Sequence, residues 1–144
     1  MSSLYPVGRV LWSLAASAGT TISAAGNSGS WAGNGPGDLL PAADFETPVN
    51  LRDVNDVALM VSVGAVTSSP TMKVGLDFYD DLGNLFADVL QTAAITAAGT
   101  TILAGGLHGG SAFSYLVLPN WGRVNWSAVS GGTFTGCSII LYGR

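Results

Sequence analysis

The sequence predicts an all-β protein, an antiparallel β-sandwich or jelly roll of about eight or nine strands, in a single domain over residues 1–144. The first observation is strict alternation over residues 72–79, which places Met72, Val74, Leu76 and Phe78 on one face of a strand. The second is a last third made of short apolar runs, rich in β-branched and aromatic residues and separated by turn residues. A chain of 144 residues is long enough to enclose a core.

The first half of the chain holds two short predicted strands and one long irregular segment. Residues 7–16 alternate imperfectly and residues 19–25 are β-branched at their centre, so both are expected to be strands. Residues 26–48 are dense in Gly, Pro and Asn, with a strong turn signal at residues 34–37. So long a loop is uncommon inside a compact domain. We expect it to pack on its own sandwich, to lie as an arm on a neighbouring subunit, or to bind a ligand.

The middle of the chain reads as a predicted hairpin followed by a turn. Residues 57–67 place four apolar side chains on one face, and residues 71–80 follow after Ser68, Ser69 and Pro70. Residues 80–84, Asp-Asp-Leu-Gly-Asn, predict a turn that leads into a further run over residues 85–90. Residues 92–101 are alanine-rich and leave a short helix open, while residues 102–110 are expected to be a glycine-rich loop.

The C-terminal third is expected to be a three-stranded meander over residues 112–118, 121–129 and 134–142. Alternation places Val124, Trp126 and Ala128 on one face, and Cys137, Ile139 and Leu141 on one face. The single cysteine therefore reads as a small buried hydrophobe.

Charged side chains are scarce in this sequence. They make up 10% of the residues, five basic and nine acidic, against about 25% in an ordinary soluble domain. The scattered basic residues and the net charge of −4 argue against nucleic acid and an anionic membrane surface as partners. Because so few charges cannot cover the surface of a free particle, we expect apolar patches to be hidden against other protein.

No catalytic or metal-binding motif is present in the sequence, and we expect neither a cofactor nor a small-molecule substrate. His108 is the single histidine and lies in a glycine-rich stretch without triad or zinc partners. Asp77, Asp80, Asp81 and Asp88 gather around one turn. Solvated turn residues are the expected role of this group, with a calcium site or a carboxylate pair of a glycosidase as alternatives.

Large apolar residues in irregular or terminal positions are the candidate interface anchors, because aromatic residues dominate interface energetics. We select Trp12, Trp31, Leu39, Leu40, Phe45 and Trp121. Exposed Trp31 or Trp121 flanked by Asp or Asn would instead indicate a surface on which sugars stack.

The sequence resembles small β-sandwich proteins of tailed-phage virions in two places. They are the turn at residues 80–84 and the ending over residues 121–144, with Trp121 to Trp126, Ser130 to Gly136 and Leu141-Tyr-Gly-Arg144. The likeness is to capsid decoration (cement) or minor head proteins and covers most of residues 50–144. It implies a non-catalytic structural protein on the capsid surface, whose partners are further copies of itself and the major capsid protein. The alternative is a carbohydrate-binding module of a phage adhesin or tail component.

Overall fold

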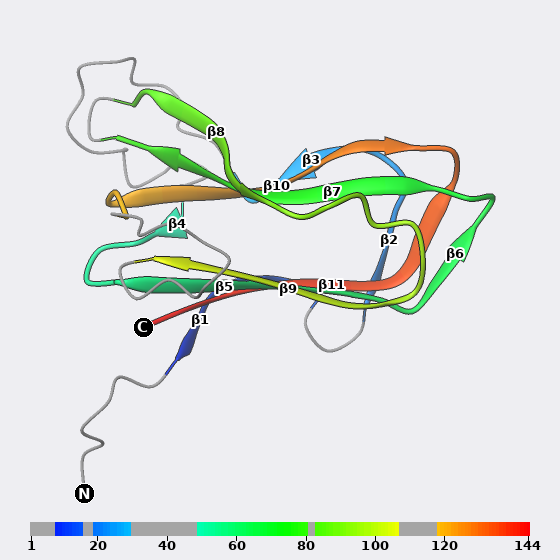
Figure 1. The fold of residues 1–144 in the computed structure, drawn as a ribbon, viewed down its shortest axis with the longest axis horizontal. Coiled ribbons are helices and arrows are strands. Elements are labelled where there is room, and N and C mark those ends of the chain that lie inside the picture. The colour runs from blue at the N-terminus through cyan, green and yellow to red at the C-terminus, as the bar shows by residue number, and fades with distance from the viewer. Residues whose placement is uncertain (1–7, 16–18, 30–48, 81–82, 107–117) are drawn as a thin grey trace, which may run out of the picture.

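The computed structural model describes residues 8–15, 19–29, 49–80, 83–106 and 118–144, and the elements within them are all strands. Two antiparallel sheets pack against each other as a β-sandwich, as the sequence predicts (Figure 1). In the described residues no helix is long and apolar enough to cross a membrane.

The first sheet, the lower layer in Figure 1, has the order β1-β11-β5-β9. Two short strands, β2 and β6, also pair with β11. The bounds are β1 Arg9–Leu14, β2 Thr20–Ile22, β5 Asp56–Val63, β6 Ala65–Thr67, β9 Gly99–Gly106 and β11 Thr133–Gly143.

The second sheet, the upper layer, has the order β3-β10-β7-β8, and the short strand β4 also pairs with β10. The bounds are β3 Gly26–Asn27, β4 Val49–Asn50, β7 Thr71–Tyr79, β8 Leu85–Gln91 and β10 Trp121–Ser130.

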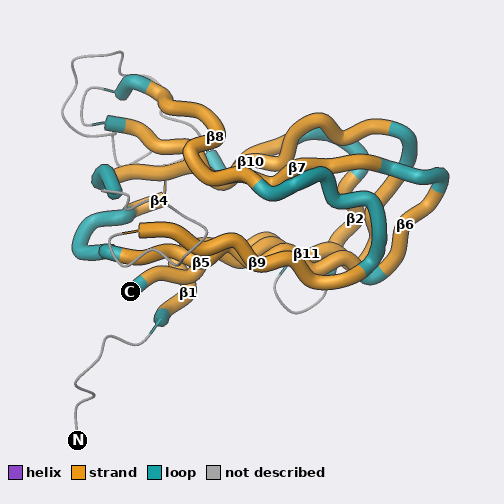
Figure 2. The backbone as a smooth tube through the Cα atoms, in the orientation of Figure 1, coloured by secondary structure: helices purple, strands orange, loops and turns teal. Residues whose placement is uncertain are grey.

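Four of the strand pairs are nested along the chain. The first strand, β1, pairs with the last, β11, and inside that pair β3 joins β10, β5 joins β9 and β7 joins β8. The pairs β1–β11 and β5–β9 lie in the first sheet and the pairs β3–β10 and β7–β8 lie in the second, so successive pairs alternate between the two layers (Figure 2). Every sheet depends on pairing between distant parts of the sequence.

The core lies between the two sheets and contains the alternating residues that the sequence predicts. The inward side chains of β5, β7 and β11 are almost fully buried, and β10 adds Val124. The burial of alternate residues follows from the period of a strand, which sends successive side chains to opposite faces. Those of β5, β7 and β11 are Val57, Leu59, Val61, Val63, Met72, Val74, Leu76, Phe78, Phe134, Cys137, Ile139 and Leu141.

Two predicted hairpins are wrong. Ser68, Ser69 and Pro70 connect β6 of the first sheet to β7 of the second, and the link after Ser130 likewise takes β10 to β11 in the opposite sheet. The C-terminal meander therefore does not form, and its first expected strand, 112–118, lies outside the described residues except for Leu118. Alternation is the same in a hairpin and in a crossing between sheets, so it could not distinguish them.

The two crossing links pack side by side at one end of the sandwich. Gly131 has a left-handed backbone, with φ of 83°, and a Cβ there would lie 2.8 Å from the Ser69 carbonyl oxygen. A Cβ at Gly132 would clash with the carbonyl oxygen of Thr67. Glycine is needed at both positions because the two backbones touch.

The region between β8 and β10 also differs from the sequence-based expectation. No helix forms over residues 92–101; instead Ile95 forms an isolated bridge with Met72. Residues 102–106 of the expected loop at 102–110 are strand instead, because they belong to β9, which pairs with β5 along its whole length. Residues 107–110 lie outside the described residues. Thr100, Thr101, Ile102 and Leu103 suit a strand, and the flanking glycines concealed this in the sequence.

Candidate functional site

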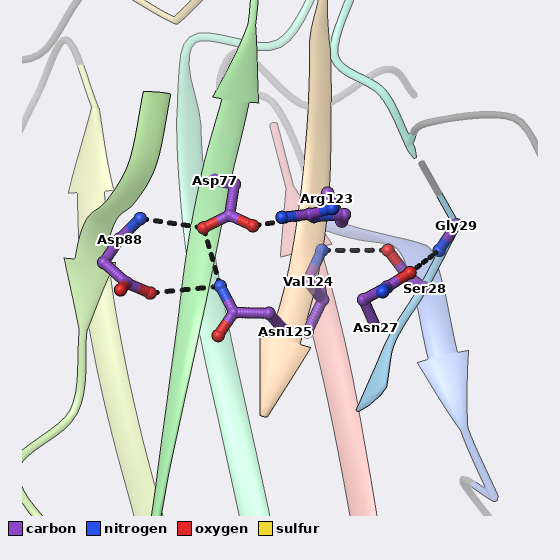
Figure 3. Close-up of polar contacts among 8 residues, drawn as sticks. All are labelled: Asn27, Ser28, Gly29, Asp77, Asp88, Arg123, Val124 and Asn125. Carbon is purple, nitrogen blue, oxygen red and sulfur yellow. Dashed lines mark hydrogen bonds and ion pairs between the residues drawn. The ribbon is translucent and has the colours of Figure 1, made fainter. Parts of the chain in front are cut away.

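A polar cluster lies on the outer face of the second sheet, formed by Asp77, Asp88, Arg123 and Asn125 (Figure 3). Asp77 lies on the outward side of β7, yet it is only 1% exposed. On β10, Arg123 is opposite Asp77, and Asn125 is opposite Gly75. The strand register thus brings a carboxylate, a guanidinium and an amide together.

Both oxygens of the Asp77 carboxylate are occupied. Arg123 Nε donates to Oδ2 at 2.7 Å, and Oδ1 accepts from Asn125 Nδ2 at 2.6 Å and from the Asp88 backbone N–H at 2.7 Å. Buried charge is tolerated only when it is paired and hydrogen-bonded, and here it is both. With its charge paired and both oxygens hydrogen-bonded, this carboxylate serves to hold β7, β8 and β10 together.

An irregularity in β8 presents the Asp88 backbone to Asp77. The register shifts between the pairs Leu76–Leu90 and Phe78–Phe86, and Asp88 has a left-handed backbone with φ of 52°. Such bulges re-aim side chains, and Asp tolerates the left-handed region better than most residues. The exposed Asp88 carboxylate then accepts from Asn125 Nδ2 at 3.1 Å.

The carboxylates around the turn do not act as one group. Asp80 accepts from the backbone N–H and the side-chain amide of Asn84, at 2.9 and 2.8 Å, which confirms its predicted role in a turn. Asp77 and Asp88 instead meet at Asn125, and Asp81 lies outside the described residues. Within the described part of the chain, no three His, Cys, Asp or Glu residues are placed to hold a metal ion.

Aromatic residues and arginines continue the cluster along the same face. The Arg123 guanidinium lies 5.8 Å from the ring centre of Tyr79, and that of Arg52 lies 4.8 Å from the ring centre of Trp121. Trp121 is only 7% exposed, which leaves little of its ring for a subunit interface or for a stacked sugar. Its Nε1 and the Oδ1 of Asn125 are buried without a hydrogen-bond partner.

Of the other five candidate anchors, one lies within the described residues and four lie outside them. Trp12 is half-buried and stacks on Trp126 of the opposite sheet, with ring centres 6.2 Å apart and planes inclined by 24°. Trp12 thus joins the two sheets, and its role as an interface anchor stays a prediction. Four further anchors and the histidine lie outside the described residues, namely Trp31, Leu39, Leu40, Phe45 and His108.

Cys137 is a buried core residue, as predicted. Burial raises the pKa of its thiol, and a backbone hydrogen bond with Ile22 lowers it by less. A thiol that resists ionisation is a poor nucleophile, so Cys137 serves the packing of β11.

The outer face of the first sheet is the second candidate site, and sequence reasoning missed it. Three of its cross-strand rows contain no charged side chain, and we call these three rows the uncharged face; the next row along β5 holds Asp56. Val10 on β1 and Ile102 on β9 are 55% and 66% exposed. The rows are Val10–Tyr142–Ala58–Ala104, Ser13–Ile140–Met60–Ile102 and Ser138–Ser62–Thr100.

Among the described residues, the charges of the first sheet gather at one end, and the second sheet carries charges on its outer face. Arg144 and Asp56 pair at 3.2 Å, and Arg9 lies opposite Gly143.

Searches against models of protein families, curated proteins and solved structures found no match to this chain.

Proposed function

We propose that the chain is a non-catalytic structural protein of a phage virion, which forms oligomers and docks on the major capsid protein at the capsid surface. The observation that carries this proposal is the uncharged face, with Val10 and Ile102 more than half exposed. Contiguous uncharged surface with exposed apolar side chains usually marks a protein interface. The scarcity of charge in the whole sequence supports the same reading.

The strand arrangement adds support. Nested pairing of β1 with β11, β3 with β10, β5 with β9 and β7 with β8 is what rolling up one antiparallel ribbon produces. We therefore assign the sandwich to the jelly rolls, a group that includes viral capsid domains and lectins.

In the proposed mechanism the uncharged face bridges adjacent capsid subunits, and each bridge resists expansion of the shell. A stable contact of this kind buries at least about 1,000 Å² in total. Met60 and Tyr142 lie on the two central strands of the face and Val10 lies beside Tyr142 on β1, so a lysine at Val10 or Met60 would be desolvated by a docked capsid subunit without a partner.

The test uses capsid shells of the phage that encodes the chain, prepared without it, and co-sedimentation. We expect the wild type to sediment with the shells, and Val10→Lys and Met60→Lys to bind at least about tenfold more weakly. Lys73→Glu, on the second sheet, is the control and should bind like the wild type.

Two outcomes would overturn the proposal. One is wild-type chain that stays in the supernatant, and the other is lysine variants that bind as well as the wild type. Binding to a glycan array, with quenching of tryptophan fluorescence, would support the carbohydrate-binding module instead.

A further inference from the structure

The edges of the two sheets differ in how well they are protected. An edge strand presents unpaired N–H and C=O groups, and proteins shield such edges with shortness, charges or bulges. Among the described strands, β2, β3, β4 and β6 are two or three residues long. β1 has a register shift and carries Arg9, and β8 has a register shift and carries Asp88.

β9 has none of these protections. It is eight residues long, GTTILAGG, with no charged residue. It pairs with β5 without a register shift, from Val63–Gly99 to Asp56–Gly106, and the described residues place no strand on its other side. Thr100, Ile102 and Ala104 are exposed on it, and Ile102 is the most exposed of the large apolar residues described.

We propose that β9 pairs antiparallel with β9 of a second copy of this chain, which joins the two first sheets into one continuous sheet. We assign the place beside β9 to a second copy for an electrostatic reason. A two-fold contact places identical residues opposite each other, so any charge on the strand would face the same charge on the partner and oppose the pairing. β9 offers no charge to repel its copy. Pairing Ile102 with itself places Thr100 opposite Ala104 of the partner and covers both exposed isoleucines.

This inference rests on the proposed function in one respect: the proposed function says that the chain forms oligomers, and the β9 pairing specifies how. It leaves the rest of the uncharged face open and extends it, because the faces of the two sheets become continuous. A paired dimer would thus present the open parts of two uncharged faces to a capsid.

The experiment measures the mass of the full chain by analytical ultracentrifugation from about 1 to 200 μM, without capsid. We expect a monomer–dimer equilibrium in the wild type and at least a tenfold weaker dimer in Ile102→Lys, since two lysines would face each other. Val10→Lys is the matched control, because Val10 is also more than half exposed but lies on β1 at the other edge of the same sheet. Circular dichroism checks that each variant is folded.

A cysteine crosslink tests the register. Directly opposed residues of antiparallel strands have Cα atoms about 4.5–5.5 Å apart, within the range that a disulfide spans. Ile102→Cys should therefore form a covalent dimer under mild oxidation, while Val10→Cys should not; the native Cys137 is fully buried.

A wild type that is monomeric at all concentrations overturns the proposed pairing, as does equal weakening by the two lysine variants or the absence of the Ile102→Cys crosslink. Co-sedimentation with capsid shells is a separate measurement, so failure of the dimer and failure of the capsid proposal can be distinguished.

Discussion

At the scale of single residues, Asp77 shows how a charged side chain can sit on the outer side of a strand and still be buried. Its two oxygens accept from Arg123, Asn125 and the Asp88 backbone. The sequence places Asp77 opposite the core and so suggests a solvated turn residue. Its hydrogen-bond partners lie on β8 and β10, and alternation along β7 alone could not predict which residues of other strands would lie beside it.

The contrast between Asp77 and Asp88 leads to a prediction. Asp77→Asn removes the charge beside Arg123 and places an amide donor among three donors, so we expect a loss of about 3 kcal/mol in the free energy of unfolding. Asp88→Asn makes the same change at an exposed carboxylate and should cost less than about 0.5 kcal/mol. Urea denaturation measures both, and equal effects would contradict the buried-clamp interpretation.

At the scale of elements, β11 bends where three glycines meet. Gly136 has φ of 60°, and Gly19, beside β2, and Gly64, between β5 and β6, approach its backbone closely. A Cβ at Gly19 would lie 3.0 Å from Gly136 Cα, and one at Gly64 would lie 3.4 Å from it. Here the strand turns toward the second sheet, and β2 and β6 follow it (Figure 1).

This bend gives a second prediction. Gly136→Ala forces a side chain into the left-handed region, and we expect it to cost about 1–2 kcal/mol of stability. Gly8→Ala is the control, because a Cβ at Gly8 meets nothing within 4 Å. Thermal unfolding followed by circular dichroism compares them, and a Gly136→Ala variant as stable as Gly8→Ala would show that the bend does not depend on glycine.

At the scale of the whole molecule, contacts between the sheets decide the stability, and the Trp12–Trp126 stack is one of them. We expect Trp12→Ala to destabilise the isolated chain by about 2 kcal/mol, less than a fully buried tryptophan would. A double-mutant cycle with Trp126→Ala should give a coupling of about 1 kcal/mol. If Trp12 were solely an anchor between subunits, Trp12→Ala would weaken oligomers and leave the unfolding of the monomer unchanged.

The sequence by itself determined the class of fold, the single buried cysteine and most inward side chains of β5, β7 and β11, because strand alternation and turn chemistry are local properties. Tertiary structure decided which strand pairs with which. The links after Thr67 and Ser130 have the composition of hairpin turns, yet each crosses between the sheets. The same local pattern buries the same side chains in either arrangement, so only the packing of both layers selects the partner. That packing also decides the uncharged face and the position of β9, on whose other side the described residues place no strand.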